Sequence, residues 1–67
     1  MEVVNQLGYI RQTIRELSQE QLARKSKVSR HTISEIELGK RVPTLKTALL
    51  LSHALNCSVE DIFILKE

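Results

Sequence analysis

The sequence predicts an all-α domain of five short helices, and three observations support this fold class. Apolar residues recur three and four positions apart in several segments, which is the spacing of one helix face. Each of four segments is preceded by a residue that commonly caps a helix: Ser18, Ser29, Thr44 and Ser58. A length of 67 residues with 42% apolar and 27% charged side chains predicts one soluble globular domain over residues 1–67.

The first helix is expected to run from about Gln6 to Arg15. Its buried face is predicted from apolar residues spaced three, four and three positions apart: Leu7, Ile10, Ile14 and Leu17. The second helix is expected from about Gln19 to Lys25, because Ser18 and Gln21 have the spacing of a capping box. It is expected to bury Leu22 and Ala23.

The third helix is predicted to begin after Ser29 and to bury Ile33 and Ile36. Val28 is the one apolar residue in the connection before it. The helix is expected to stop at Gly39, because glycine adopts the left-handed backbone conformation without a steric penalty from Cβ.

The fourth helix is expected to follow Pro43, to be capped by Thr44 and to end at Asn56, a residue that tolerates the left-handed region. Its predicted core residues are Leu45, Ala48, Leu51, Ser52 and Leu55. A short fifth helix over 59–62 is expected after its cap, Ser58. The β-branched and aromatic residues at 3–4 and 63–65 indicate a small two-stranded pairing of the chain ends.

The arrangement of charge points to nucleic acid. The net charge is only +2, but six of the ten Lys and Arg residues lie between residues 24 and 41. A local basic patch of this kind is typical of a surface that meets phosphates. The alternative for Arg24 and Lys25 is that they only complement the C-terminal dipole of the second helix.

Catalytic and metal chemistry is not indicated by the sequence. Cys57 is the only cysteine, and His31 and His53 lie on different predicted helices without metal-ligand spacing. No glycine-rich phosphate loop is present. No apolar run is longer than that of Ala48 to Leu51, which is too short to cross a bilayer. We therefore expect a cytoplasmic protein that is not an enzyme and has no cofactor, no metal and no small-molecule ligand.

The second and third predicted helices, separated by about three residues, form a helix-turn-helix pattern. A recognition helix must enter the major groove of DNA with its outer face free, so the helix before it has to hold its inner face. With Ile33 and Ile36 turned inward, the outward positions carry groups that read base edges or flank them: Arg30, His31, Ser34, Glu35 and Leu38. Any solvated helix also has a polar outward face, so this pattern alone leaves both interpretations open.

Residues 17–63 resemble the helix-turn-helix domain of the phage Cro and repressor type, also called the XRE family. The resemblance depends on Ser-Gln-x-x-Leu-Ala at 18–23, Val-Ser-x-x-Thr-Ile-Ser at 28–34, and Ile-Glu-x-Gly-Lys at 36–40 followed by Pro43. It implies a five-helix fold like that of lambda repressor and a DNA-binding function. It also implies which residues meet DNA: Gln19, Ser29, Arg30, His31, Thr32, Ser34, Glu35, Lys40 and Arg41.

Glu37 is expected to have a structural role, because the resemblance implies an ion pair between it and an arginine of the first helix. The usual arginine position holds Gln12, with Arg11 before it and Arg15 after it. The usual glycine before the second helix is also missing, where the chain reads Arg15-Glu16-Leu17. We interpret this as a one-residue insertion, which leaves the partner of Glu37 open between Arg11 and Arg15.

The chain ends are similar to those of short single-domain family members such as a cytolysin operon repressor, which act as dimers. A domain this small buries only about 60% of its unfolded surface, so association would stabilise it. The expected homodimer interface is an apolar set larger than one small core requires: Leu49, Leu50, Ile62, Phe63 and Leu65.

These observations predict a sequence-specific regulator that binds double-stranded DNA as a homodimer on a palindromic operator, and that acts as a repressor. The alternative is an antitoxin-like module whose main role is to bind a partner protein.

Overall fold

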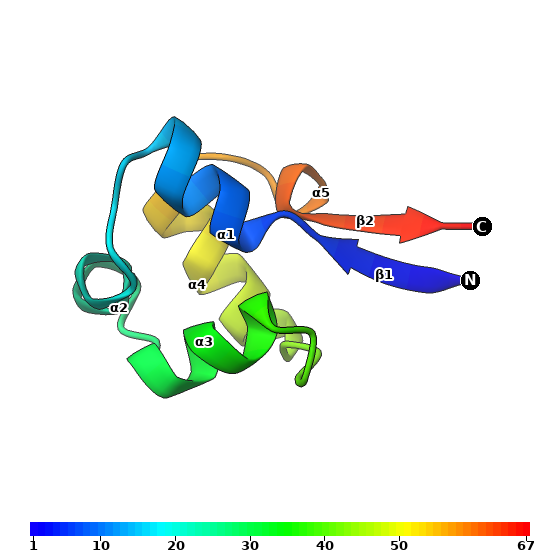
Figure 1. The fold of residues 1–67 in the computed structure, drawn as a ribbon, viewed down its shortest axis with the longest axis horizontal. Helices are drawn as coiled ribbons and strands as arrows, with labels where there is room; N and C mark the ends of the chain where they lie inside the picture. The colour runs from blue at the N-terminus through cyan, green and yellow to red at the C-terminus, as the bar shows by residue number, and fades with distance from the viewer.

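The computed structural model describes all residues from Met1 to Glu67. Helical segments form a bundle at one end of the molecule, and the two strands leave it together at the other (Figure 1). In chain order the elements are β1 (Glu2–Asn5), α1 (Leu7–Tyr9), η1 (Ile10–Ile14), α2 (Gln19–Ser26), α3 (Arg30–Glu37), α4 (Leu45–Leu55), α5 (Val59–Ile62) and β2 (Phe63–Lys66). The predicted fold class, a helix-turn-helix bundle with a small terminal sheet, is confirmed.

The helix N-termini lie where the capping residues predict them. The hydroxyl oxygens of Ser18, Ser29, Thr44 and Ser58 each accept a hydrogen bond from the backbone N–H three residues later. At α2 the capping box is complete, because Gln21 Oε1 also accepts from the backbone N–H of Ser18 at 2.8 Å. These bonds satisfy donors that the helix itself leaves unpaired.

Residues in the left-handed conformation end three of the helices. Gly39 (φ 76°) follows α3 and Asn56 (φ 54°) follows α4, as predicted, and Lys27 (φ 64°) follows α2. At α3 the N–H of Gly39 donates to Ile36 O at 3.0 Å, and the N–H of Lys40 donates to Glu35 O at 2.9 Å. These two bonds are the Schellman motif, which fixes the direction in which the chain leaves the helix.

The first helical segment contains a wide turn that the sequence did not reveal. Residues 10–14 form the π-helical element η1, in which the N–H of Arg15 donates to Ile10 O at 2.9 Å, five residues back. Such a turn holds one residue more than an α-helical turn. It accommodates the extra residue inferred before the second helix, and Glu16 (φ 55°) then takes the left-handed conformation where a glycine was expected.

The core lies between α1, α2, α3, α4 and α5. Its nine buried apolar residues are Leu7, Ile10, Leu22, Val28, Ile33, Ile36, Leu51, Leu55 and Ile62. Two predictions for the core are wrong. Ile14 is 50% exposed, because the wide turn changes the angle per residue and the α-helical spacing no longer holds; Leu45, in the first turn of α4, is 74% exposed because no element packs over it.

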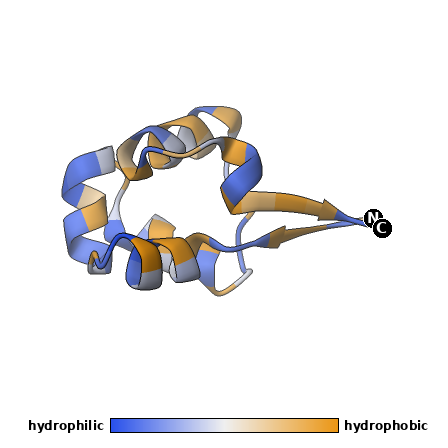
Figure 2. Ribbon diagram, turned by 90° about the horizontal axis from the view of Figure 1, so that it is seen from above, coloured by the Kyte–Doolittle hydropathy of each residue, from blue (hydrophilic) through white to orange (hydrophobic).

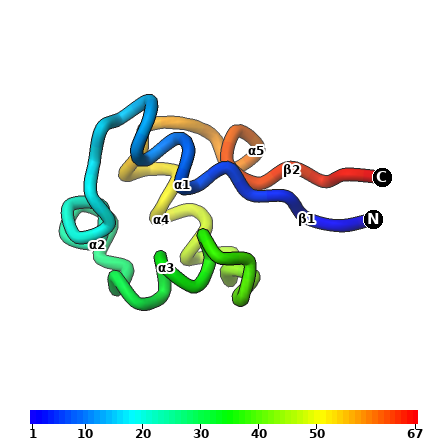
Figure 3. Tube along the Cα trace, viewed as in Figure 1, coloured from blue at the N-terminus to red at the C-terminus, as the bar shows by residue number.

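The two ends of the chain pair as antiparallel strands, as predicted. Glu2 lies opposite Lys66 and Val3 opposite Leu65. The two strands run side by side away from the bundle (Figure 3). They are largely hydrophobic along their length (Figure 2) although most of their side chains are exposed.

Candidate nucleic-acid interface

The connection between α2 and α3 is a short, well-anchored turn. Its middle residue, Val28, is buried in the core, and its backbone N–H donates to the Ser26 hydroxyl at 3.2 Å. That hydroxyl in turn donates to Leu22 O at 2.7 Å, within α2. These two hydrogen bonds satisfy buried polar groups of the turn and hold α3 beside α2 (Figure 1).

Helix α3 has one buried face and one free face. Ile33 and Ile36 are completely or almost completely buried, at 0% and 1% exposure. Arg30 and His31 are exposed at its N-terminal end, and neither Arg30 nor Lys40 makes an ion pair within the protein. The N-terminal end of α3 thus carries exposed donors on a helix whose other face is packed in the core, as a helix that reads a groove requires.

Three of the predicted contact residues also have structural roles. The Ser29 hydroxyl accepts from the Thr32 N–H at 3.1 Å and donates to Thr32 Oγ1 at 2.9 Å. The Gln19 side chain donates from Nε2 to Glu37 Oε1 at 3.0 Å, which ties the start of α2 to the end of α3. These residues hold the helix termini in place, and any contact they make with DNA must use their remaining hydrogen-bonding groups.

The partner of Glu37 is Arg11. Arg11 Nε lies 2.7 Å from Glu37 Oε2, and Nη2 donates to Oε1 at 3.0 Å, with both side chains nearly buried. Arg15 instead donates to Leu55 O at 2.8 Å. Sequence reasoning missed Gly8, where an added Cβ would lie 3.2 Å from Glu37 Oε1. A small residue at this position lets the first helix approach the ion pair.

The structure also brings together three residues that were each predicted to face DNA. Glu35 Oε1 lies 2.8 Å from Arg41 Nη2 and 3.5 Å from His31 Nε2. Sequence reasoning treated Glu35 as a base contact and Arg41 as a backbone contact and missed their pairing. The available signal was the turn at Gly39, which brings the following residues back toward the end of α3.

The residues predicted for a homodimer interface differ in their exposure. Ile62 has 0% exposure and belongs to the monomer core, so its assignment to an interface is wrong: α5 turns this side chain inward. Leu50 and Phe63 are partly buried against the same core. Leu49 and Leu65 remain 51% and 61% exposed.

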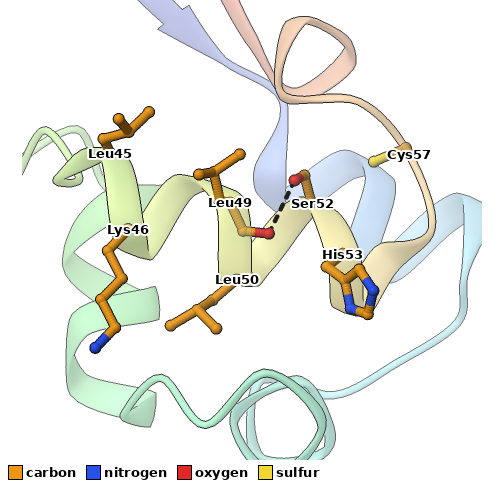
Figure 4. Close-up of a pocket in the computed structure, with 7 residues that line it drawn as sticks. All are labelled: Leu45, Lys46, Leu49, Leu50, Ser52, His53 and Cys57. Atoms are coloured by element: carbon orange, nitrogen blue, oxygen red, sulfur yellow. Dashed lines mark hydrogen bonds between the residues drawn. The ribbon is translucent and has the colours of Figure 1, made fainter.

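Leu49 also lines a shallow groove on the outer side of α4. The other residues lining the groove are Leu45, Lys46, Leu50, Ser52, His53 and Cys57 (Figure 4). Burial is the main cause that raises the pKa of the Cys57 thiol, which favours its protonated form.

No group of three or more His, Cys, Asp or Glu side chains is arranged to hold a metal ion. None of the helices has the length and apolar character needed to cross a membrane.

Comparison with known proteins identifies the class to which this arrangement belongs. Residues 7–62 match the family model described as helix-turn-helix. The chain belongs to the helix-turn-helix family. This match covers the whole bundle, from α1 through α5, so the predicted resemblance to XRE-type proteins is confirmed. At the level of class, the chain is a DNA-binding transcriptional regulator.

Curated relatives agree with the family match. The chain is 44% identical over 63 residues to an uncharacterised HTH-type transcriptional regulator of Methanocaldococcus jannaschii, with 94% of each chain covered. It is 43% identical over 51 residues to one of Archaeoglobus fulgidus, covering 76% of this chain and 72% of the relative. It is 42% identical over 50 residues to an HTH-type transcriptional regulator of Bacillus subtilis, covering 75% of this chain and 76% of the relative.

Proposed function

We propose that this protein binds a specific double-stranded DNA sequence as a homodimer, on a two-fold symmetric operator in the cytoplasm, and represses transcription there. The observation that carries the proposal is that α3 has one face packed in the core and a free, exposed N-terminal end. Its inner face is locked by Ile33 and Ile36, and its N-terminal end presents unpaired Arg30 toward solvent. A helix held in this way fits the major groove of B-DNA.

Base reading is assigned to the exposed end and outward face of α3. Arg30 can donate two hydrogen bonds to guanine O6 and N7, and Glu35 can accept from an exocyclic amino group. His31 lies between them on the same helix and is exposed. Ser34, which is partly buried on the same helix, is permissive toward any base.

Phosphate contacts are assigned to the helix N-termini and to the basic residue after α3. The first turns of α2 and α3 carry backbone N–H groups that the helices leave unpaired, next to Gln19 and Ser29. The Thr32 N–H is already bonded to the Ser29 hydroxyl, so Thr32 offers its own hydroxyl to this surface. Lys40 is exposed and unpaired, so it is free to neutralise a phosphate. Such contacts set the register of the protein on DNA and make its affinity depend on salt.

The homodimer is supported by apolar side chains that the monomer leaves exposed. In the antiparallel ribbon formed by β1 and β2, Val3 and Leu65 lie opposite each other and are 52% and 61% exposed. On α4, Leu49 is half exposed, and Leu50 and Phe63 add the parts of their surface that the core leaves open. Burial of such surface stabilises a small domain, and a two-fold dimer matches a palindromic site.

Repression is proposed because a DNA-binding domain can act by occupancy alone. A dimer that covers two half-sites in successive major grooves excludes other proteins from the same stretch of DNA.

Selection of bound sequences from a random double-stranded DNA library, at near-physiological salt, tests the proposal. The expected result is a two-fold symmetric motif with half-sites separated by about 34 Å, one helical turn. Weak, salt-sensitive binding with no enriched motif would contradict it and would favour the alternative, a module that sequesters a partner protein. Transcription from a promoter that carries the selected motif then distinguishes repression from activation.

A further inference from the structure

Glu35 is the only acidic side chain on the outward face assigned to base reading, and it lies between two cationic or potentially cationic groups. Both approach the same oxygen, Oε1: Arg41 Nη2 at 2.8 Å and His31 Nε2 at 3.5 Å. The Glu35 side chain is 27% exposed, whereas Arg41 is 51% and His31 79% exposed. Arg41 is therefore the nearer and better covered partner of the carboxylate.

The Oε1 atom of Glu35 is itself buried and has no aligned hydrogen-bond donor, although Arg41 Nη2 is within ion-pair distance. A buried carboxylate oxygen without a hydrogen bond depends on a neighbouring positive charge for its stabilisation. Arg41 supplies that charge, so the position of the Glu35 carboxylate depends on Arg41.

The backbone places Arg41 for this contact. Gly39 and Lys40 close the Schellman motif at the end of α3, with the Lys40 N–H bonded to the carbonyl of Glu35 itself. Arg41 is the next residue along the chain. Its side chain therefore starts from a fixed point close to Glu35, and the pair does not require a flexible loop to find it.

We propose that Arg41 determines sequence specificity by positioning Glu35, and that it does not act as a phosphate contact. This inference rests on the proposed DNA-binding function. Glu35 accepts hydrogen bonds and cannot donate them, so it selects a base that offers an amino group in the major groove, namely cytosine N4 or adenine N6. Arg41 fixes the direction of the carboxylate and offsets its repulsion by the DNA phosphates.

Lys40 provides a matched control. It is the preceding residue, carries the same charge and is exposed, but makes no ion pair. Replacement of Lys40 removes a phosphate contact, whereas replacement of Arg41 releases Glu35. The two substitutions therefore have different consequences for salt dependence and for base preference.

The experiment measures binding to the selected operator and to its single-base variants over a range of salt concentrations. The proteins compared are the wild type, Arg41→Gln, Glu35→Gln, the double variant and Lys40→Gln. Arg41→Gln and Glu35→Gln are expected to lose about tenfold discrimination at the same base position in each half-site, and the double variant no more than either alone. Lys40→Gln is expected to keep the base preference and to reduce the slope of log K against log salt by about 0.9 per protomer, whereas Arg41→Gln leaves that slope nearly unchanged. Thermal unfolding of each variant confirms that it is folded.

The inference alone would be overturned if the wild-type protein selects a motif, but Arg41→Gln weakens binding to all sequences by the same factor and reduces the salt slope. An unchanged base preference in Glu35→Gln would also overturn it. If the wild-type protein selects no motif, the proposed function fails and the inference fails with it.

Discussion

Arg11 and Glu37 form a two-point ion pair that joins the first helical segment to the end of α3. Nε–Oε2 and Nη2–Oε1 distances of 2.7 and 3.0 Å, with side-chain exposures of 11% and 12%, describe a pair that is nearly withdrawn from water. Arg11 Nη1 also donates to Leu17 O at 2.8 Å. One guanidinium thus holds the start of the bundle, the turn before α2 and the end of α3.

Removal of one partner of this pair is expected to destabilise the protein strongly. Glu37→Ala leaves the guanidinium of Arg11 nearly buried and unpaired, which typically costs about 3–5 kcal/mol. The matched control is Arg24→Ala, since Arg24 pairs with Glu20 at 3.9 Å on the exposed surface and should contribute less than about 1 kcal/mol. Urea denaturation measures both, and equal losses for the two variants would contradict the structural role of the pair.

Glu16→Gly should stabilise the protein. Glu16 has φ 55°, a left-handed conformation in which the Cβ of a non-glycine residue is strained, and its side chain is exposed and makes no hydrogen bond or ion pair. We expect a gain of about 1 kcal/mol in the free energy of unfolding, after allowance for the greater freedom of glycine in the unfolded chain. Glu16→Ala keeps the Cβ and should give no such gain. A Glu16→Ala gain as large as that of Glu16→Gly would show that strain is not the cause.

Asp61 is expected to make stability depend on pH in the acid range. Hydrogen bonding by Ser58, mainly from its backbone N–H and secondly from its hydroxyl, holds the pKa of the Asp61 carboxyl below the ordinary value of 3.8. A pKa lowered by folding stabilises the native state above the unfolded pKa, and this contribution is lost as pH falls through the folded pKa. The stability difference between wild type and Asp61→Asn should therefore shrink below about pH 4. Thermal unfolding between pH 2 and 7 measures it, and a difference independent of pH would count against this account.

Arg30→Ala should relax recognition at one base position and leave other positions unchanged. Arg30 is exposed and unpaired at the start of α3, where an arginine reaches guanine. The expected loss is about 1–3 kcal/mol of discrimination at that position. Titration against operator variants measures it. An affinity loss that is equal for all sequences would identify Arg30 as a phosphate contact.

Leu65→Asp should convert the proposed dimer to monomers. Leu65 is 61% exposed, so a charge there is harmless to the folded monomer but is costly inside an apolar interface. Ile14→Asp is the control, since Ile14 is 50% exposed in a surface depression near Cys57 and Asp61, outside the proposed interface. Sedimentation at several concentrations measures both variants. If Leu65→Asp sediments as wild type does, the interface lies elsewhere or is absent.

The features that the sequence predicts well are local ones. Each of the four caps joins residues only three positions apart, and Gly39 and Asn56 end their helices through their own backbone preferences. The identity of the buried face of α3 follows from spacing within a single turn. These interactions do not depend on distant residues, so their residue types are sufficient to place them.

The features that the sequence did not predict depend on tertiary geometry. The choice of Arg11 over Arg15 for Glu37 follows from the wide turn of η1, and no pattern in the sequence distinguishes an extra residue in the helix from one in the loop. Burial of Ile62 and exposure of Leu45 depend on which elements cover them. The contact of Glu35 with Arg41 depends on how sharply the chain turns at Gly39.

The pairing of β1 with β2 brings the two ends of the chain together, so that almost the whole chain forms the loop between them. Glu2 and Lys66 are neighbours in space although nearly every other residue lies between them in sequence, and the Gln6 N–H bonds to Ile62 O at 2.7 Å where the ribbon meets the bundle. Contacts with so large a sequence separation close a long loop and form after local ones. The backbone amides of β1 and β2 should therefore become protected from hydrogen exchange in the last step of folding. A spectroscopic label on either strand would report complete folding of the domain and not the earlier formation of the helices.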